Sequence, residues 1–256
     1  MTNGRIEEDE WIRNKLHEIY SENNPLKPEY YVKLLGSVKM SAYFLKECKV
    51  IINHKKLHRL RKELGYVRRY RRRHTHPVRR STQHKINSAG IIWEIDIKFI
   101  PTIEDGNVAL LDIIDVYSKE IVGSYIGKSC TSKDVVRIIS EAILYQESVP
   151  NIIRSDNGSQ VKSICCREAV EELGIMHEFG IKHHPDSQAY IEAQHSNIQR
   201  EFMALNIFKN AEDVFIKYRV YMYFYHYLRP HGSLNYETPM AYKGNGNNSK
   251  IIIVKR

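Results

Sequence analysis

From residue 89 onward, hydrophobic and polar positions follow short periodic segments that are typical of an α/β domain. Residues 91–100, IIWEIDIKFI, carry apolar side chains at every odd position, whereas the even positions include Glu94, Asp96 and Lys98. This period of two predicts a strand with one face on a core and one charged face. Further strands are predicted at 107–118 and 120–127, and the short polar links favour an antiparallel meander.

After the meander, helical and strand patterns alternate. A helix at 131–146 is predicted from one apolar stripe and from a capping-box-like start at Thr131. The pattern then predicts a strand at 149–156, a helix at 159–173, a strand at 174–180, a helix from near Gln188 past Arg200, and an aromatic-rich helix at 211–228. A meander continued by strands that are linked through helices predicts a mixed sheet. The tail, 235–250, has the composition of a loop.

The first quarter of the chain has a helical period instead. Helices are expected at 5–20 and through 31–35 and 40–45. Asn53 is a favourable N-cap for another, basic helix, and Gly65 suits the position just past its end. Short helices that end in a basic one predict an all-α, helix-turn-helix-like DNA-binding domain.

Charge is distributed unevenly along the chain. The whole chain has a net charge of +9, but residues 46–85 hold 15 Lys and Arg against two acids, a local charge of +13. The remainder has 24 basic and 28 acidic residues, a net charge of −4. A segment this basic repels itself unless it meets a polyanion, and nucleic acid is the obvious candidate. A solvated basic linker is the alternative.

Composition also narrows the class of protein. With 256 residues, 42% of them hydrophobic, the chain is long enough for a sizeable core plus a smaller domain. No apolar run reaches the ~18 residues of a membrane span, and the polar, acidic start shows no secretory signal. The four cysteines show no Cys-x-x-Cys spacing, which favours free thiols in a reducing cytoplasm.

Three carboxylates are candidates for an active site, because two lie on predicted strands and one lies on a later helix. Asp96 lies mid-strand on the charged face, Asp156 closes the strand before the turn signal Asp-Asn-Gly, and Glu192 lies early on a helix. Asp156 and Glu192 are separated by 35 residues, enough chain to leave the sheet and return beside it. Each acid alone also has an ordinary structural explanation: a surface acid, a turn residue and a helical surface acid. Glu94, Asp112 and Asp115 are rivals, ranked behind these three.

The pattern D…D-35-E resembles the retroviral-integrase superfamily of DDE recombinases. Over about residues 90–243 the resemblance extends to several short sequence motifs. These motifs are WEID, IIDVYSKEIVGSYIG, SDNGSQ, PDSQAYIEAQHSNIQREF and YLRPHGSLNYETPMAY. The chain most resembles a DDE transposase of the insertion-sequence family three, the larger reading-frame product. Asp115 resembles the aspartate of the family's IDxxS word, where a structural role is expected.

The resemblance implies a ribonuclease H-like core with a mixed five-stranded sheet flanked by helices. It implies that Asp96, Asp156 and Glu192 bind two Mg²⁺ or Mn²⁺ ions and catalyse strand nicking and strand transfer during DNA integration. The implied partners are double-stranded DNA at the element ends and target, a second copy in a homodimer or higher assembly, and the upstream-frame product. No membrane partner is implied, and the expected location is the cytoplasm of a prokaryote, on the nucleoid.

Contacts to DNA are predicted from basic side chains. They are Lys55, Lys56, Arg59, Arg61, Lys62, Arg68, Arg69, Arg71, Arg72, Arg73, Lys182 and Arg200. Related integrases carry lysines one and two turns after the helical glutamate, whereas this chain has Ser196 and Gln199. Contact with the DNA backbone therefore passes to neighbours such as Arg200, Lys182, His183 or His184.

The expected organisation has four parts: a helical DNA-binding domain at 1–76, a basic linker at 77–88, the catalytic core at 89–205, and a C-terminal helix and tail at 206–256. Two alternatives to a transposase stay open. One is a ribonuclease H-like nuclease that only hydrolyses DNA, and the other is a DNA-binding protein with an inactive core.

Overall fold

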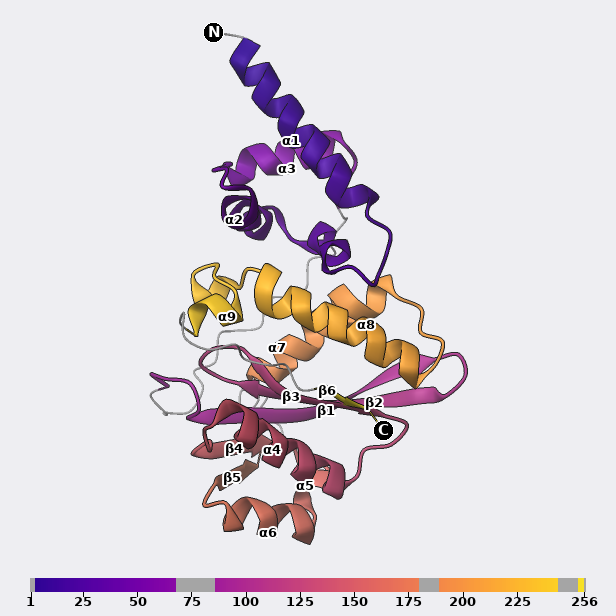
Figure 1. Ribbon diagram of the computed structural model, residues 1–256, viewed down its shortest axis with the longest axis vertical. Coiled ribbons are helices and arrows are strands. Elements are labelled where there is room, and N and C mark those ends of the chain that lie inside the picture. Colours follow the sequence, from indigo (N-terminus) through magenta and orange to yellow (C-terminus); the bar gives the residue numbers. More distant parts are fainter. Residues whose placement is uncertain (1–2, 68–85, 180–188, 244–252, 256) are drawn as a thin grey trace.

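A single mixed sheet organises the described part of the chain, which in this computed structural model comprises residues 3–67, 86–179, 189–243 and 253–255 (Figure 1). Its strands are β1 (Ile92–Thr102), β2 (Gly106–Asp115), β3 (Ile121–Gly127), β4 (Ile152–Ser155), β5 (Met176–Phe179) and β6 (Ile253–Lys255), in the order β5-β4-β1-β2-β3-β6. β1, β2 and β3 form the predicted antiparallel meander, and β4 and β5 run parallel to β1. The predicted mixed five-stranded sheet is confirmed, and β6 extends it beside β3.

One face of the sheet is covered by α4 (Ser132–Gln146), α5 (Ser159–Lys162) and α6 (Ile164–Glu172). Trp93 and Ile95, two of the predicted inward-facing residues of β1, are buried in this cluster. The predicted capping box at the start of α4 is present. The single helix predicted at 159–173 is instead two helices, because Ser163 adopts an extended backbone and its hydroxyl caps α6.

The other face is covered by helical segments from later in the chain. They are α7 (Ala189–Asn197), the π-helical turn η3 (Ile198–Phe202), the 3₁₀ turn η4 (Met203–Leu205), α8 (Ala211–Tyr223) and the π-helical turn η5 (Phe224–Leu228). The charged face of β1 is therefore not a solvent face: Glu94 on it is only 1% exposed. β1 lies in the middle of the sheet, where it can hold a site rigidly.

The N-terminal helices form a further layer beyond α8 (Figure 1). They are α1 (Asn3–Ser21), the 3₁₀ helix η1 (Pro28–Leu34), α2 (Ser37–Cys48) and α3 (His54–Glu63). The basic helix begins as predicted, with the Asn53 side chain accepting a hydrogen bond from the backbone of Lys55. It ends as predicted too, because Gly65 has a φ of +75°, a conformation that glycine adopts without strain.

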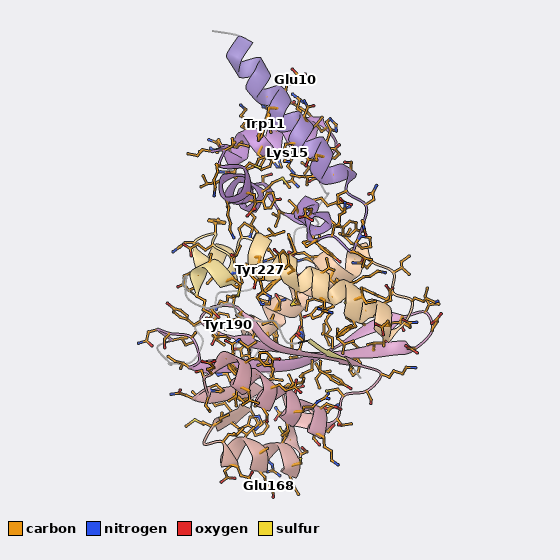
Figure 2. All side chains as sticks on the ribbon, viewed as in Figure 1. Glu10, Trp11, Lys15, Glu168, Tyr190 and Tyr227 are labelled. Carbon is orange, nitrogen blue, oxygen red and sulfur yellow. The ribbon has the colours of Figure 1, made fainter. Side chains whose placement is uncertain are left out.

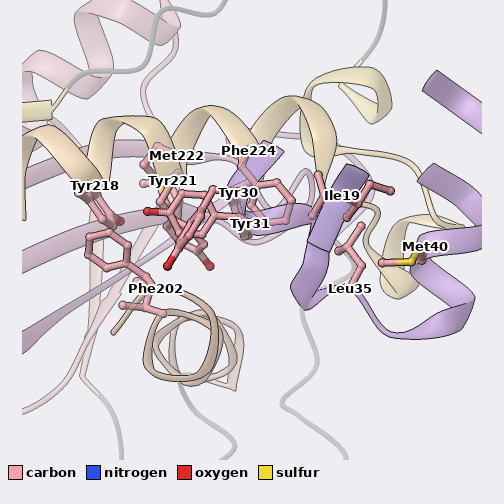
Figure 3. Packing of buried hydrophobic residues seen from close by; sticks show 14 of the residues in the cluster. Ile19, Tyr30, Tyr31, Leu35, Met40, Phe202, Tyr218, Tyr221, Met222 and Phe224 are labelled. Atoms are coloured by element: carbon pink, nitrogen blue, oxygen red, sulfur yellow. The ribbon is translucent and has the colours of Figure 1, made fainter. Parts of the chain in front are cut away.

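This N-terminal layer shares one hydrophobic cluster with the C-terminal helices. Tyr31 packs edge-on against Tyr221, with ring centroids 5.3 Å apart, and also contacts Phe202 and Phe224 (Figure 3). The Tyr30 hydroxyl donates a 3.1 Å hydrogen bond to the Leu205 carbonyl. The division of the chain at residue 76 stays a prediction, but the helices on the two sides of it pack as one core.

In its described part, residues 235–243, the predicted loop contains a short helix, α9 (Pro239–Tyr242). This helix forms for local reasons. The Thr238 hydroxyl accepts a hydrogen bond from the Ala241 backbone N–H, and Pro239 occupies the first turn of the helix, where proline is favoured. The ammonium group of Lys243 then reaches Glu120 at 2.7 Å.

No helix in the described ranges is both long and apolar enough to cross a membrane. Cys48, Cys130, Cys165 and Cys166 are free thiols. Burial raises the pKa of Cys166 to about 11, so this thiol stays protonated at neutral pH.

Candidate active site

The register between β1 and β4 brings two of the predicted acids together. The last pair in this parallel ladder is Ile95 with Ser155, so Asp96 and Asp156 are the next residues on neighbouring strands. Adjacent strands lie about 4.8 Å apart, and residues at the same level of a parallel pair point to the same face. The two aspartates therefore occupy neighbouring positions at one level of the sheet.

Asp156 is a turn residue as well as a predicted site residue. Its Oδ1 accepts a 2.8 Å hydrogen bond from the backbone of Gly158, and the side chain is exposed. A Cβ atom on residue 158 would lie 2.8 Å from the same oxygen, so a larger residue there would displace the Asp156 carboxylate. The turn thus fixes the carboxylate at the strand end while leaving it accessible.

The third acid arrives on α7, which is fastened to β1. The backbone N–H groups of Tyr190 and Ile191 donate to Glu94 Oε2 at 3.0 and 2.9 Å. One turn later, His195 Nδ1 lies 3.0 Å from Asp96 Oδ2. Glu192 is three residues before His195, and side chains at this spacing share one helix face. The structure therefore brings the helix that carries Glu192 against the strand that carries Asp96.

These acids are not gathered into a ready-made metal cage. Across 3–67, 86–179, 189–243 and 253–255, no three His, Cys, Asp or Glu side chains are grouped so that they could hold one ion. Asp96 is about one quarter exposed, and Asp156 and Glu192 are exposed. The donors are nevertheless carboxylate oxygens, the ligand type that Mg²⁺ prefers.

His195 was not predicted as a site residue, although its spacing from Glu192 was a signal for it. It lies between two carboxylates, with Nε2 4.0 Å from Asp112 Oδ2. Asp112 is the cross-strand partner of Asp96 on β2 and is completely buried. Its carboxylate accepts hydrogen bonds from Ser124 at 2.5 Å and Tyr218 at 2.7 Å, and burial raises its pKa. Asp112 is thus part of the support beneath the site and does not reach solvent.

The other two rivals also have structural contacts. Asp115 accepts hydrogen bonds from the backbones of Gly90 and Ser118, at 2.8 and 2.7 Å, and so ties together two loops. Glu94 is fully engaged with α7, and burial raises its pKa to about 7. Arg154 faces its other oxygen at 3.9 Å. Neither acid has a carboxylate free for a ligand.

The predicted DNA contacts divide into three groups. Lys55, Arg59 and Lys62 on α3 are exposed, and Lys56 is half-buried in an ion pair with Asp9 at 2.6 Å. Arg200 is exposed and bonded to its helix neighbour Asn197. Arg68, Arg69, Arg71, Arg72, Arg73, Lys182, His183 and His184 lie outside the described residues.

Arg61 does not fit its predicted role. It is only 6% exposed, and its guanidinium donates hydrogen bonds to the hydroxyls of Tyr20 and Ser37. Because Arg61 lies on the same side of α3 as the apolar stripe, its guanidinium joins α3 to α1 and α2 and is turned away from solvent. Burial argues against a DNA contact for this residue, because the prediction counted charge without separating the two faces of the helix.

Comparison with known proteins agrees with this architecture. Two family models described as integrase core domain match residues 87–185 and 173–239. An uncharacterised 39.2 kDa protein of insertion element IS476 from Xanthomonas euvesicatoria is 26% identical over 200 residues, which are 76% of this chain and 56% of that protein. The transposase for insertion sequence element IS904 from Lactococcus lactis is 26% identical over 161 residues, which are 62% of this chain and 63% of that protein.

A solved structure shares the fold. A chain of the simian T-cell lymphotropic virus intasome, in complex with PP2A regulatory subunit B56 gamma, aligns with a TM-score of 0.55 and 16% identity, over 80% of this chain and 75% of that one. The predicted ribonuclease H-like integrase core is thereby confirmed as the fold. The chain spans little more than half the length of the first relative above, so the comparison concerns the shared core. Residues 87–239 are therefore similar to integrase core domains, and the chain is also similar to proteins of bacterial insertion elements.

Proposed function

We propose that this chain is a DDE transposase of the insertion-sequence family three, which nicks and joins DNA by metal-dependent phosphoryl transfer. Asp96, Asp156 and Glu192 are the proposed catalytic residues. One observation carries the proposal: two acids follow the last paired residues of neighbouring parallel strands, and the helix bearing the third is hydrogen-bonded to the first of these strands. A rigid sheet edge of this kind suits a reaction that depends on positioning.

Two divalent ions, Mg²⁺ or Mn²⁺, would be held by these carboxylates and would supply Lewis-acid stabilisation of the attacking and leaving oxygens. The donor set fits in kind, because all three groups are oxygen ligands and two of them are exposed. In the described residues the three are not preassembled, so bound ions and DNA would complete the arrangement. His195, in contact with Asp96, restricts the orientation of that carboxylate.

The proposed partner is double-stranded DNA, both at the ends of the element and at the target. Exposed Lys55, Arg59 and Lys62 on α3 present positive charge on the N-terminal layer, and the adjoining segment through residue 85 adds more. Because two element ends must be joined to one target, the active assembly is at least a homodimer on DNA. The product of an upstream reading frame is proposed as a further partner, and the cytoplasm as the location.

The test of this function uses a pre-nicked element end together with a circular plasmid. In the presence of Mg²⁺, the purified protein is expected to join the end to the plasmid, which gel electrophoresis detects as a new, larger product. Cleavage without joined product would support the nuclease alternative. Binding with neither reaction, in Mg²⁺ and in Mn²⁺, would support the inactive DNA-binding alternative.

DNA binding is expected to weaken steeply with salt if residues 46–85 contact the phosphates. Each neutralised phosphate contributes about 0.9 to the slope of log K against log salt. Contact with about six phosphates would lower affinity roughly 10³-fold between about 50 and 200 mM salt. Fluorescence anisotropy of a labelled duplex measures the slope, and the combined variant Arg71→Ala, Arg72→Ala, Arg73→Ala should reduce it. An affinity that is indifferent to salt would contradict this role of the segment.

A further inference from the structure

The first turn of α7 receives its hydrogen-bond acceptor from another element. The first N–H groups of any helix have no partner within the helix, and a negative charge near them is favourable. Here both Tyr190 N–H and Ile191 N–H donate to one oxygen, Oε2 of Glu94 on β1. Glu94 is two residues before Asp96 on the same face of the strand. A single carboxylate therefore joins the strand of Asp96 to the helix of Glu192.

A second contact holds the same turn from the hairpin between β2 and β3. The ammonium group of Lys119 lies 3.5 Å from the ring centroid of Tyr190, in a cation–π contact. Figure 2 labels Tyr190. Lys119 has a φ of +60°, and its ammonium group also donates to the Val116 carbonyl. Burial lowers the pKa of Lys119 to about 8. Two independent elements thus hold residue 190, immediately before Ile191 and Glu192.

Glu94 is itself held in place across the sheet. Arg154 on β4 is its register partner, and its guanidinium lies 3.9 Å from Glu94 Oε1. On the other side, Arg154 Nε donates to Glu178 Oε2 at 2.7 Å, and Glu178 is in turn the register partner of Arg154 on β5. Glu94, Arg154 and Glu178 form a charged row across three parallel strands. Along their strands, Glu94 and Arg154 stand two residues before Asp96 and Asp156. The row fixes the orientation of the Glu94 side chain.

We propose that Glu94 is a positioning residue for the reaction: by accepting both N–H groups of the first turn of α7, it sets the place of Glu192 relative to Asp96. This inference rests on the proposed function, because it assumes that Glu192 and Asp96 act together. It assigns Glu94 no contact with metal or DNA. Both of its oxygens already have protein partners, and the side chain is 1% exposed.

The test compares Glu94→Gln with Glu94→Ala. The glutamine carbonyl can still accept from both N–H groups, whereas alanine leaves them without an acceptor. For Glu94→Ala we expect the amides of residues 190 and 191 to exchange with deuterium at least about tenfold faster, since a lost hydrogen bond of about 1.4 kcal/mol is tenfold in an equilibrium. Strand transfer should fall by a similar factor, with unchanged affinity for DNA. Glu94→Gln should restore most of both.

Glu168→Ala is the matched control, because it removes an exposed carboxylate of α6 that belongs neither to this charged row nor to α7. It should leave exchange at residues 190 and 191 at the wild-type rate. Wild-type exchange in folded Glu94→Ala would overturn the inference. So would equal loss of activity in Glu94→Ala and Glu94→Gln with unchanged exchange, which would make Glu94 a reacting group. The exchange readout does not depend on activity, so it remains decisive even if the chain fails to join DNA.

Discussion

Replacing Asp156 with asparagine is expected to abolish nicking and strand transfer while leaving the affinity for DNA unchanged. The asparagine carbonyl can still accept the hydrogen bond that Asp156 Oδ1 accepts from Gly158, so the turn is preserved. What is lost is a negative oxygen ligand at the strand end. Removing metal-dependent stabilisation of about 4 kcal/mol corresponds to roughly a 10³-fold lower rate. Rates on a nicked element end, with affinity from anisotropy, measure the two effects separately.

Matched variants make this prediction sharper. Glu192→Gln should reproduce the loss, because it also removes one charge from the proposed ligand set. Glu168→Gln makes the same chemical change at an exposed position of α6 (Figure 2) and should retain the wild-type rate. Equal processing of DNA by wild type and Asp156→Asn would show that the catalytic acids have been wrongly assigned.

Replacing Arg229 with methionine is expected to lower the free energy of unfolding by about 3–5 kcal/mol, the usual cost of leaving one partner of a buried ion pair alone. Arg229 is 2% exposed, and its guanidinium contacts both carboxylate oxygens of Glu201 at 2.7 Å. This pair connects the end of η5 to η3, next to the α7 segment. Denaturant unfolding at pH 7 measures the change, and Arg13→Ala, which removes an exposed ion pair, should alter stability by less than about 1 kcal/mol.

The loss in Arg229→Met should depend on pH. In the wild type, burial would raise the pKa of Glu201, but Arg229 outweighs it and holds this pKa below its ordinary value of 4.5. The pair therefore contributes stability above pH 4.5 and loses it as pH falls through the lowered pKa. In the variant only the weaker influences of Lys39 and Arg200 oppose burial, so the folded state favours protonated Glu201 at low pH. The difference between the two proteins should narrow from pH 7 towards pH 4.5, and a constant difference would contradict this account.

The sequence predicted the succession of β1 to β5 and of most helices along the chain, because these segments have clear periodicity. It did not predict the break at Ser163, where a local side-chain cap interrupts an otherwise helical pattern. Nor did it predict that the N-terminal helices and α8 share a core. Apolar stripes indicate that a helix face is buried, but they do not say which element buries it. The packing of Tyr31 against Tyr221 depends on that missing information.

For the site, the chain pattern identified three acids, and the register of β1 with β4 accounts for the proximity of two of them. The support around them was not predictable in the same way. Glu94 and Asp112 are indistinguishable from ligands by charge and strand position, and only their hydrogen bonds assign them to the scaffold. Arg61 illustrates the same limit in the N-terminal layer, since its burial depends on the packing of α1 and α2. The proposed function is that Asp96, Asp156 and Glu192 act together in catalysis.

The shared core of the N-terminal and C-terminal helices has a consequence for biosynthesis. Tyr30 and its partner Leu205 are 175 residues apart in the chain. At about 5–20 residues per second, the ribosome needs roughly 9–35 seconds to supply the second after the first. During that interval Tyr30 and Tyr31 of η1 can pack only on the other N-terminal helices, and the side that later contacts the C-terminal helices stays exposed. Nascent chains that end before residue 205 lack these packing partners of η1 altogether.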